Sequence, residues 1–455
     1  MDIEKLEALA GKAAEPLSKE TGKIQVVSHF DADGICAGSI AYHTLKLLGK
    51  NFDIEFIKQL EEDELKRISV IEADLFLFTD LGSGQLDNIR KYIPDKIIVI
   101  ADHHELQGDS WDNLYHLNCH MAGLDGKDEI SGAGVTYFLM KHMTDKVSSM
   151  IYLALVGAAG DVQKKDGVFK SVNNHLLEEA LKLDAITIKK GLRLFGRSTR
   201  PLHRVLRYAN EIDLPFADDE SKCIQFLSNL GIPMKNGNND WITLSDLTGE
   251  QEKKLATAII LNSDVTSNKN NIVGNIFIIP TKYEIREFAT MLNSCGRMGK
   301  SIEGLKLCLG MTDNIETIQK AYKRKIATYL NLVKKDSTMI RKTEYVSYIV
   351  AKDRIEDNFI GTILSILSNS YFDSKICFAF ANSSNGVKVS SRAHKSMDGK
   401  INLKEIVGMA VEVTGGEGGG HSLASGAKIP AGTEELFISE VEKHIIEQMQ
   451  DTRTE

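Results

Sequence analysis

Short, continuous apolar segments recur through the first third of the chain and alternate with stretches of helical periodicity. Four of them cover residues 24–28, 75–79, 96–101 and 153–160. Uninterrupted apolar runs of this length are typical of parallel strands that are buried on both faces. After a helical segment over residues 1–20, residues 21–195 therefore predict an α/β domain built on a doubly wound parallel sheet.

Acidic and histidine side chains follow each of these four segments. They are His29, Asp31 and Asp33; Asp80; Asp102, His103 and His104; and Asp161. Open parallel sheets bind ligands beyond the carboxyl ends of their strands, so these side chains are expected to meet in one crevice. A single Asp at a strand end is commonly a turn or helix-capping residue. Four such motifs in succession favour a shared site instead.

The side chains in these motifs form a ligand set for divalent cations. A set with mostly carboxylates and some imidazoles suits Mn²⁺ or Mg²⁺ better than a metal that selects thiolates. The set is large enough to hold two ions, and Asp80 would bridge them. The expected ligands are His29, Asp31, Asp33, Asp80, His103 and Asp161. Two cations about 3.5–4 Å apart activate water and neutralise charge in phosphoester hydrolysis. Without cations, so many carboxylates would repel one another and their pKa values would rise.

These motifs, in this order, resemble the first to fourth motifs of the DHH phosphoesterase superfamily, which is named after its Asp-His-His motif. The His-x-Asp-x-Asp-Gly spacing at residues 29–34 resembles the RecJ branch, and within it the archaeal RecJ-like exonucleases and GINS-associated nucleases. Residues 118–135 and 287–299 resemble two further family segments, although the family's usual Asn-Pro reads Asn118-Cys119 here.

The resemblance implies a manganese- or magnesium-dependent exonuclease that cuts single-stranded DNA from an end in DNA replication or repair. By this resemblance, one metal would be bound by His29, Asp31 and Asp80. The other metal would be bound by Asp33, Asp80, His103 and Asp161. It implies catalytic roles for Asp80, Asp102 and His104. In these roles His104 contacts the substrate or leaving group, and Asp102 orients an imidazole and raises its basicity.

The C-terminal part of the chain resembles the associated DHHA1 substrate domain at residues 390–392 and 415–427. A Gly-rich turn at residues 415–420 would let backbone N–H groups approach a phosphate, and Arg392 can form a bidentate pair with phosphate. Two substrate-binding residues are expected in the 287–299 segment, Asn293 and Arg297. The others are expected in the C-terminal part: Ser390, Arg392, Gly418, Gly419, Gly420 and His421.

The pattern predicts four parts along the chain. They are a DHH catalytic domain at 1–199, a mainly helical insertion at 200–285, a helical linker at 286–342 and a smaller α/β DHHA1 lobe at 343–455. Strands are predicted in the last lobe near 345–350, 376–380 and 386–392, and a cleft is expected between the two lobes. In archaeal relatives such an insertion docks the replisome component GINS; a lid or spacer is the alternative.

Composition is ordinary for a globular protein, with 26% charged residues and a net charge of −8. No apolar run approaches the ~20 residues that span a bilayer, so no membrane segment is expected. Six scattered cysteines without a Cys-x-x-Cys pair argue against a zinc module and favour a reducing, cytoplasmic location.

Two basic runs interrupt the acidic chain, and each is either a solvated helix face or part of a groove for a nucleic-acid strand. The first contains Lys189, Lys190, Arg193, Arg197, Arg200, Arg204 and Arg207. The second contains Lys320, Lys323, Arg324, Lys325, Lys334, Lys335, Arg341 and Lys342. Four aromatic residues lie within these runs: Phe195, Tyr208, Tyr322 and Tyr329. They either stack on bases of a bound strand or pack in the core.

Two alternatives to the exonuclease remain at this point. The first is hydrolysis of short oligonucleotides, cyclic dinucleotides or pyrophosphate by the same kind of centre. The second is a non-catalytic replisome scaffold, although members that have lost activity tend to lose ligands and all six positions are filled here. The sequence leaves open the polarity of digestion, the choice between DNA and RNA, and the native metal.

Overall fold

The computed structural model describes residues 2–164, 167–209, 214–217, 219–263, 272–311 and 315–451. The chain divides into two compact units, Met1–Ile318 and Gln319–Glu455. Within the described ranges, no helix is both long and apolar enough to cross a membrane.

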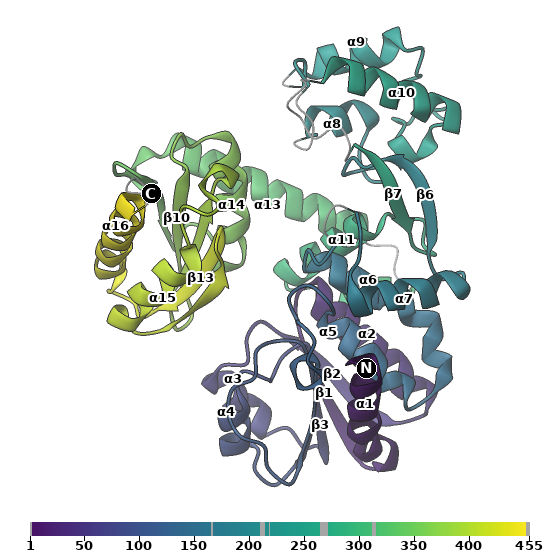
Figure 1. The fold of residues 1–455 in the computed structure, drawn as a ribbon, viewed down its shortest axis with the longest axis vertical. Coiled ribbons are helices and arrows are strands. Elements are labelled where there is room, and N and C mark those ends of the chain that lie inside the picture. The colour runs from purple at the N-terminus through teal and green to yellow at the C-terminus, as the bar shows by residue number, and fades with distance from the viewer. Residues whose placement is uncertain are drawn as a thin grey trace. The chain divides into compact units, whose positions relative to one another are not determined.

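A five-stranded parallel sheet forms the centre of the first unit (Figure 1). In the spatial order β2-β1-β3-β4-β5 its strands are β2 (Asn51–Ile57), β1 (Lys23–His29), β3 (Leu75–Thr79), β4 (Ile97–Asp102) and β5 (Leu114–Asn118). One face packs on α1 (Asp2–Lys19), α2 (Ala32–Leu47), α5 (Gly132–Lys141) and α6 (Ile151–Gly160). The other packs on α3 (Glu62–Ser69) and α4 (Leu86–Tyr92). Burial on both faces explains why β3 is apolar at every position but its last.

The predicted α/β architecture is confirmed, but one predicted strand is wrong. Residues 153–160 lie in helix α6, which is buried along most of its length. A short apolar run cannot be distinguished by periodicity from a helix that is apolar on all sides. The helix contains Gly157, where a Cβ would lie 2.0 Å from a carboxylate oxygen of Asp33, so close packing against Asp33 requires glycine.

The rest of the first unit contains the predicted helical insertion, which has a core of its own. After α7 (Ser171–Lys182), the antiparallel pair β6 (Thr187–Leu192) and β7 (Val273–Ile278) leads to and from it. The insertion contains α8 (Leu202–Arg207), α9 (Glu220–Asn229) and α10 (Gly249–Asn262), and α11 (Ile285–Arg297) and α12 (Ser301–Cys308) follow it. Short 3₁₀ turns lie at Cys119–Ala122, Asp145–Met150 and Leu244–Asp246.

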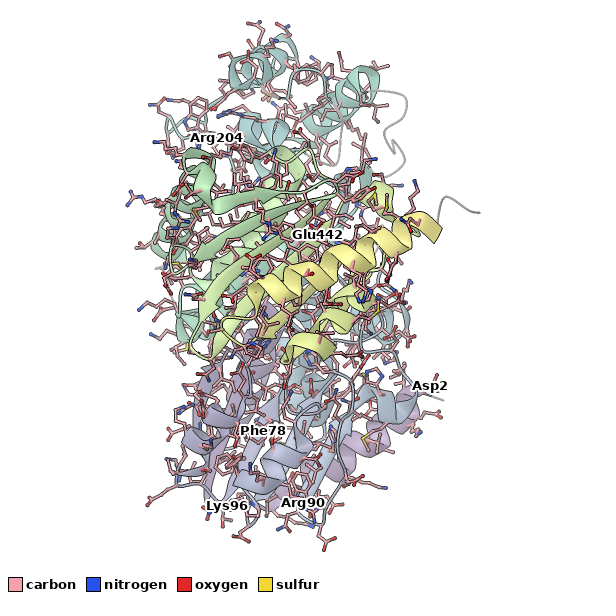
Figure 2. The ribbon with its side chains drawn as sticks, turned by 90° about the vertical axis from the view of Figure 1, so that its left-hand side faces the viewer. Asp2, Phe78, Arg90, Lys96, Arg204 and Glu442 are labelled. Carbon is pink, nitrogen blue, oxygen red and sulfur yellow. The ribbon has the colours of Figure 1, made fainter. Side chains whose placement is uncertain are left out.

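The second unit is a six-stranded mixed sheet with helices on both faces. Its strands are β8 (Ile340–Lys342), β9 (Val346–Lys352), β10 (Ile376–Ser383), β11 (Gly386–Ala393), β12 (Glu417–His421) and β13 (Ala424–Ile429). Its helices are α13 (Ile315–Lys335), which contains the boundary between the units, α14 (Asp357–Ser370), α15 (Leu403–Thr414) and α16 (Glu434–Asp451), with 3₁₀ turns at Ser337–Met339 and Lys395–Met397. Figure 2 shows α16 lying across the strands, with Glu442 on it; Glu442 accepts a hydrogen bond from Tyr348 of β9 (2.6 Å).

The predicted glycine-rich turn at 415–420 is also partly wrong. Only Gly415 and Gly416 form the turn, with φ values of 78° and 102°. From Glu417 onward the segment is β12, which pairs with β13 in antiparallel register. Glycine is usually depleted in strands, and this obscured the edge strand in the sequence.

Several residues of the basic runs make contacts within the fold. Arg197 is buried and forms two 2.7 Å hydrogen bonds with Glu252. Arg207 pairs with Glu220 at 2.6 Å. In the second run, the helical tyrosines at 322 and 329 pack on the ring of Phe359. The runs therefore do not form a continuous free basic face, and two of the four interleaved aromatic residues pack against a buried ring.

Candidate metal centre

The loop between β1 and α2 presents three of the predicted ligands. His29 ends β1, and Asp31 is the N-cap of α2, where it accepts a hydrogen bond from the backbone N–H of Gly34 (3.1 Å). Asp33 lies in the first helical turn and is buried. A Cβ at Gly34 would lie 2.2 Å from the carbonyl oxygen of His29, so this tight turn requires glycine.

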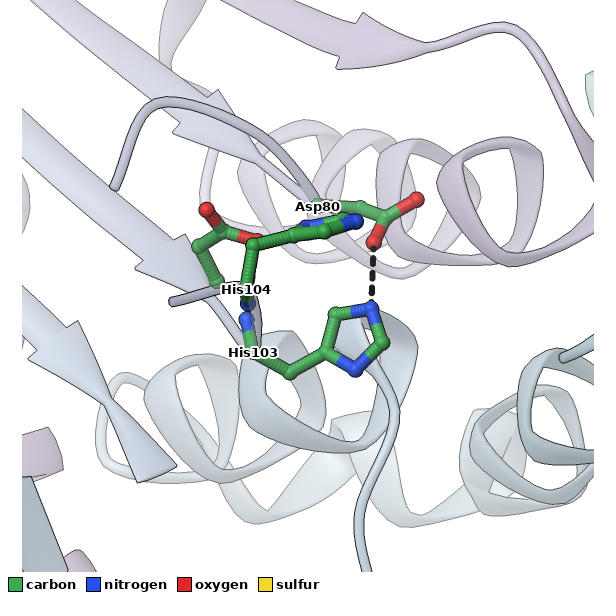
Figure 3. A group of neighbouring side chains, drawn as sticks. Asp80, His103 and His104 are labelled. Atoms are coloured by element: carbon green, nitrogen blue, oxygen red, sulfur yellow. Dashed lines mark hydrogen bonds and ion pairs between the residues drawn. The ribbon is translucent and has the colours of Figure 1, made fainter. Parts of the chain in front are cut away.

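Asp80 occupies the middle of the centre. It follows β3 in a left-handed conformation (φ 58°), which Asp adopts more readily than most residues, and is only 2% exposed. Its Oδ2 lies 3.5 Å from Nδ1 of His29. Its Oδ1 lies 3.3 Å from Nε2 of His103, the contact that Figure 3 marks with a dashed line. Within the described residues, Oδ1 has this ion-pair contact with His103 but no hydrogen bond. Each carboxylate oxygen therefore faces a different imidazole, as a bridging ligand would.

His103 is oriented by a backbone carbonyl. Its Nδ1 lies 2.7 Å from the carbonyl oxygen of Gly126, so Nδ1–H donates and Nε2 is directed toward the carboxylates. Besides Asp80, Nε2 lies 3.4 Å from Asp161 and 3.7 Å from Asp33. Asp161 reaches this point as the C-cap of helix α6, not from the end of a strand. Asp161 therefore lies beside the other predicted ligands, although the local structure at Asp161 differs from the prediction.

Asp102 and His104 form a separate pair. The carboxylate of Asp102 is fully buried and accepts hydrogen bonds from the backbone N–H groups of His103 (2.8 Å) and Ser83 (3.0 Å). It also accepts one from Nδ1 of His104 at 2.8 Å. The imidazole of His104 is 55% exposed, so a substrate can reach it. Asp102 therefore orients His104, while its own oxygens are occupied by N–H donors.

Two supporting networks were not predicted from the sequence. Ser83 Oγ lies 2.8 Å from both His116 Nε2 and Asn118 Nδ2, and the same amide nitrogen of Asn118 donates to the carbonyl oxygen of His104 (2.9 Å). On the other side, Gln163 Nε2 donates to the carbonyl of Gly126 (2.9 Å), which is the acceptor that orients His103. Such groups support the ligands rather than contacting the reacting atoms.

The sequence carried only a weak signal for these supporting residues. Ser83 lies three residues after Asp80, and Gln163 lies two residues after Asp161. Their partners lie 19 to 37 positions away in the chain, which no local pattern reveals.

The electrostatics of the centre suit bound cations. Burial raises the pKa of Asp33 well above its usual value, and the charges of Asp80 and Asp161 raise it further. Burial raises the pKa of Asp161 to about 7 against the lowering effect of His103. Burial lowers the pKa of His103, but the neighbouring carboxylates outweigh this effect and raise it well above 6.5. Carboxylates that retain protons near neutral pH are under mutual repulsion, which a divalent cation would relieve.

The geometry fits two cation-binding groups. Ligand atoms lie within 4.8 Å of one another in His29, Asp31 and Asp80, and in Asp33, His103 and Asp161. A third such group joins Asp80 to the Asp102, His103 and His104 motif. These groups combine carboxylate oxygens with two or three imidazole nitrogens, a set of ligand atoms that fits Mn²⁺ or Mg²⁺. Oδ1 of Asp80 is buried and forms no hydrogen bond, so it is available to a cation.

Comparison with known families identifies three domains along the chain. Residues 23–159 match the N-terminal domain of the DHH family, 194–272 the DHH-CID domain and 344–447 the DHHA1 domain. The chain belongs to the DHH phosphoesterase superfamily. An uncharacterised protein of Methanocaldococcus jannaschii is 27% identical over 461 residues, which cover 98% of this chain and 99% of that protein.

Solved structures share the whole fold of this DHH protein at low sequence identity. RecJ from Thermus thermophilus, in complex with Mn²⁺, matches 97% of the chain with a TM-score of 0.59 and 16% identity. This chain spans 55% of the length of that RecJ chain. CDC45 from Entamoeba histolytica matches 96% of the chain and 99% of its own length, with a TM-score of 0.63 and 12% identity. These likenesses establish a RecJ-like fold.

Helix α11, which follows the insertion, supports the first ligand loop of the DHH domain. Asn293 Oδ1 accepts a hydrogen bond from the backbone N–H of Ala32 at the start of α2 (3.0 Å). At Gly296, a Cβ would lie 1.9 Å from the carbonyl oxygen of Phe30, so α11 packs directly on the loop. Asn293 therefore has a structural contact of its own. Substrate binding by Asn293 and by Arg297, which is partly buried, stays a prediction.

The remaining predicted substrate residues lie in the DHHA1 domain, on β11 and β12. Arg392 donates to Ser365 Oγ of α14 (2.9 Å) and to the carbonyl oxygen of Ser391 (2.7 Å). Ala424 of β13 lies opposite Arg392 of β11 on one side and opposite His421 of β12 on the other. Arg392 and His421 therefore lie at the same level of the sheet, one on each side of β13. Gly418 does not belong with them, because a Cβ there would meet Val407 and Val411 of α15 on the opposite face.

Proposed function

We propose that this protein hydrolyses phosphodiester bonds at an end of single-stranded nucleic acid, DNA foremost, with two divalent cations, Mn²⁺ before Mg²⁺. The observation that carries the proposal is the position of Asp80, whose two oxygens face His29 on one side and His103 on the other. His29, Asp31 and Asp80 would hold one cation, and Asp33, Asp80, His103 and Asp161 the other. Bound cations would supply an activated water and charge neutralisation at phosphorus.

His104 is the proposed proton donor to the leaving oxygen. The charge of Asp102 raises the pKa of His104 against the opposing effect of burial, so the imidazole stays protonated at neutral pH more readily than a free histidine. Because Asp102 accepts from Nδ1, the proton on Nε2 faces away from that carboxylate and is available to substrate. General acid catalysis of this kind contributes about 10²–10⁴-fold to the rate.

The test is a digest of end-labelled single strands of DNA and RNA with Mn²⁺ or Mg²⁺ and with each terminus blocked in turn. Stepwise release of nucleotides from one end, with duplexes cut poorly, supports the proposal and fixes polarity. A preference for dinucleotides or cyclic dinucleotides over longer strands would contradict the exonuclease and would favour a phosphodiesterase of short oligonucleotides.

A second role follows from the whole-chain likeness to CDC45 and from the DHH-CID domain. We propose that the insertion docks the GINS complex in a replication assembly. Trp241 and Tyr208 are exposed on the insertion and offer apolar contact area for a protein partner. Co-sedimentation with purified GINS, compared between the wild type and Trp241→Ala, tests this role. A protein that binds metal and GINS but cuts no strand would be the non-catalytic scaffold.

A further inference from the structure

Helix α11 contacts the chain beside the ligands of both cation-binding groups. Asn293 accepts a hydrogen bond from the backbone N–H of Ala32 in the first ligand loop (3.0 Å). One helical turn earlier, Ala289 meets the end of α6. There, a Cβ at Gly160 would lie 2.9 Å from the Cβ of Ala32 and 3.8 Å from the Cβ of Ala289. Gly160 directly precedes the predicted ligand Asp161, so the position of α11 bears on both ligand segments.

The first turn of α11 is fixed by a buried carboxylate. Glu287 is 1% exposed, and both of its carboxylate oxygens lie 3.1 Å from the backbone nitrogen of Ser198. The side chain of Thr199 and the backbone of Arg197 donate to the same carboxylate. We call residues 197–199 the joint. Displacement of α11 from the joint would leave a buried carboxyl group without partners, which is costly.

The joint is also bound to the helical part of the insertion. The guanidinium of Arg197 forms two 2.7 Å hydrogen bonds with Glu252 of α10. The carbonyl oxygen of Arg197 accepts hydrogen bonds from the backbone N–H (3.0 Å) and the Oγ (3.1 Å) of Ser245. The side chains of Arg197 and Glu252 are largely buried, so water competes little for these contacts. The joint therefore connects the insertion to α11 through buried polar contacts on both sides.

Two further contacts fix the start of α11. Glu284, the N-cap of the helix, lies 3.7 Å from Nζ of Lys164, which follows Asp161 by three residues. The side chains of Glu284 and Lys164 are both buried. Arg286 donates to the carbonyl oxygen of Arg193, which directly follows β6 (3.4 Å). The start of α11 is thus bound to the Asp161 segment as well as to the entry of the insertion.

Between these contacts α11 is one continuous helix, which Figure 1 shows at the base of the β6–β7 pair and beside α6. A helix transmits displacement along its axis, because its backbone hydrogen bonds keep its length fixed. We propose that the insertion holds the metal centre in its cation-binding geometry. The joint positions α11 through Glu287, and α11 positions the first ligand loop through Asn293. Glu287 is then a positioning residue, and the insertion is more than a lid or spacer. The proposal rests on the cation binding proposed above.

Hydrogen exchange of the cation-free full chain tests the coupling directly. The backbone N–H of Ala32 donates to Asn293, so its exchange rate reports whether α11 holds the loop. Glu287→Gln keeps the volume of the side chain but replaces one acceptor oxygen by an NH₂ group, which then faces the N–H donors of the joint. We expect several-fold faster exchange at Ala32. Exchange should be unchanged at the backbone N–H of Ser83, which donates to Asp102 instead.

Calorimetric titration with Mn²⁺ measures the consequence for cation binding. Loss of a group that supports a ligand directly costs about 10–100-fold in metal affinity, so Glu287→Gln, which acts one step further away, should weaken Mn²⁺ binding by about threefold to tenfold. Glu252→Gln removes the charge that holds Arg197 and should act in the same direction from within the insertion. The control is Glu220→Gln, the same substitution in the same insertion. It weakens the pair with Arg207 of α8 and should leave Mn²⁺ affinity unchanged.

A double-mutant cycle distinguishes this coupling from a general loss of stability. If Glu287 acts through Asn293, adding Glu287→Gln to Asn293→Ala should change Mn²⁺ affinity no further. Added to Gln163→Met, which removes a support of His103 instead, Glu287→Gln should weaken Mn²⁺ binding by its full factor. A substitution that only destabilises the fold would weaken Mn²⁺ binding equally in both backgrounds.

Wild-type exchange at Ala32 in Glu287→Gln, wild-type Mn²⁺ affinity in that variant, or equal effects in the two backgrounds would overturn the coupling. Weakening of Mn²⁺ binding by Glu220→Gln as strong as that by Glu252→Gln would overturn it too, because the joint would then have no special role. A wild-type protein that binds no Mn²⁺ would instead overturn the proposed cation centre. The exchange at Ala32, measured without cations, would still decide whether the insertion holds the loop.

Discussion

The metal centre of the DHH domain and the β11–β13 sheet of the DHHA1 domain place their charged residues differently. In the centre, four carboxylates are packed around two imidazoles, and the pKa of Asp161 rises to about 7. In the sheet, Lys388, Arg392 and Lys428 alternate with core residues along β11 and β13. The centre therefore requires added positive charge, whereas the sheet keeps its charged side chains away from its core.

This contrast predicts different consequences of substitution. Changes in the centre should remove catalysis and alter cation affinity, and some should leave the cation-free protein as stable as before. Changes of the charged residues on the sheet should leave the cation affinity of the centre unchanged.

Asp80→Asn should have the largest effect. Asn tolerates the left-handed backbone at this position, so the fold should survive, but the neutral amide cannot bridge two cations. Lewis-acid stabilisation is worth several kcal/mol, so Mn²⁺-dependent hydrolysis should fall by about 1,000-fold or more. The control is Asp184→Asn, another left-handed aspartate (φ 53°) on the surface. Cleavage by Asp80→Asn within tenfold of the control would refute the bridging role.

The second test varies pH in the presence and absence of Mn²⁺. His103 and Asp161 both have raised pKa values in the folded protein, so both bind more protons folded than unfolded. Protonation of Asp161 stabilises the folded protein fully below the pKa of the unfolded state, near 4, and this stabilisation is lost as pH rises through about 7. Protonation of His103 does the same below 6.5, and its contribution is lost as pH rises through its higher folded-state pKa. The cation-free protein should therefore lose stability from pH 5 to 8.

Mn²⁺ affinity should follow the opposite course. Cations compete with protons for Asp161, so affinity should rise by up to about tenfold per pH unit below 7. Calorimetric titration and thermal melts over this range, with and without Mn²⁺, measure both trends. A cation-free melting temperature that rises from pH 5 to 8 would contradict the repulsion assigned to the centre.

Gln163→Met should have a smaller effect, confined to the centre. It removes the donor to the carbonyl of Gly126, which in turn accepts from His103 Nδ1. Loss of such supporting hydrogen bonds costs about 10–100-fold in metal affinity or activity. Ser83→Ala is the matched comparison, because Ser83 Oγ supports the Asp102–His104 pair through Asn118 instead. We expect Gln163→Met to weaken Mn²⁺ binding and Ser83→Ala to lower kcat at unchanged Mn²⁺ affinity. Equal changes in Mn²⁺ affinity would contradict separate networks.

The two regions also differ in how far the sequence could predict them. His29, Asp80 and His103 follow apolar strands, and parallel strands carry their ends to one edge, so their convergence was predictable. Asp161 was predicted at the end of a strand and lies instead at the C-cap of a helix. The sequence could not show this, because an apolar run that is buried on all sides has no distinguishing period. In the DHHA1 domain, the predicted turn at 415–420 concealed a strand, in which side chains alternate between two faces. Gly418 and Gly419 lie on opposite faces, and the sequence alone could not distinguish them.

The smallest predicted effect concerns strain beside the centre. Val162 follows Asp161 in a left-handed conformation (φ 60°), and its N–H donates to Ala159 (3.3 Å) while that of Gln163 donates to Ala158 (2.9 Å). This pattern closes a helix C-terminus and usually has glycine at the left-handed residue. A β-branched residue there costs about 1–2 kcal/mol, and its side chain, 74% exposed, recovers little by packing. The strain lies between one predicted ligand and the residue that supports another.

Val162→Gly should therefore raise the free energy of unfolding, by up to about 1 kcal/mol after the entropic cost of glycine. Val70→Gly is the control, since Val70 is equally exposed and ends α3 with φ −91°, where glycine brings only that cost. Urea denaturation of the cation-free proteins compares the two. If the strained turn aims Asp161, the stabilised variant should bind Mn²⁺ several-fold more weakly, because glycine admits other directions for the carboxylate. A loss of stability equal to that of Val70→Gly would show that the turn stores no strain, and the contrast between the centre and the sheet would then rest on charge alone.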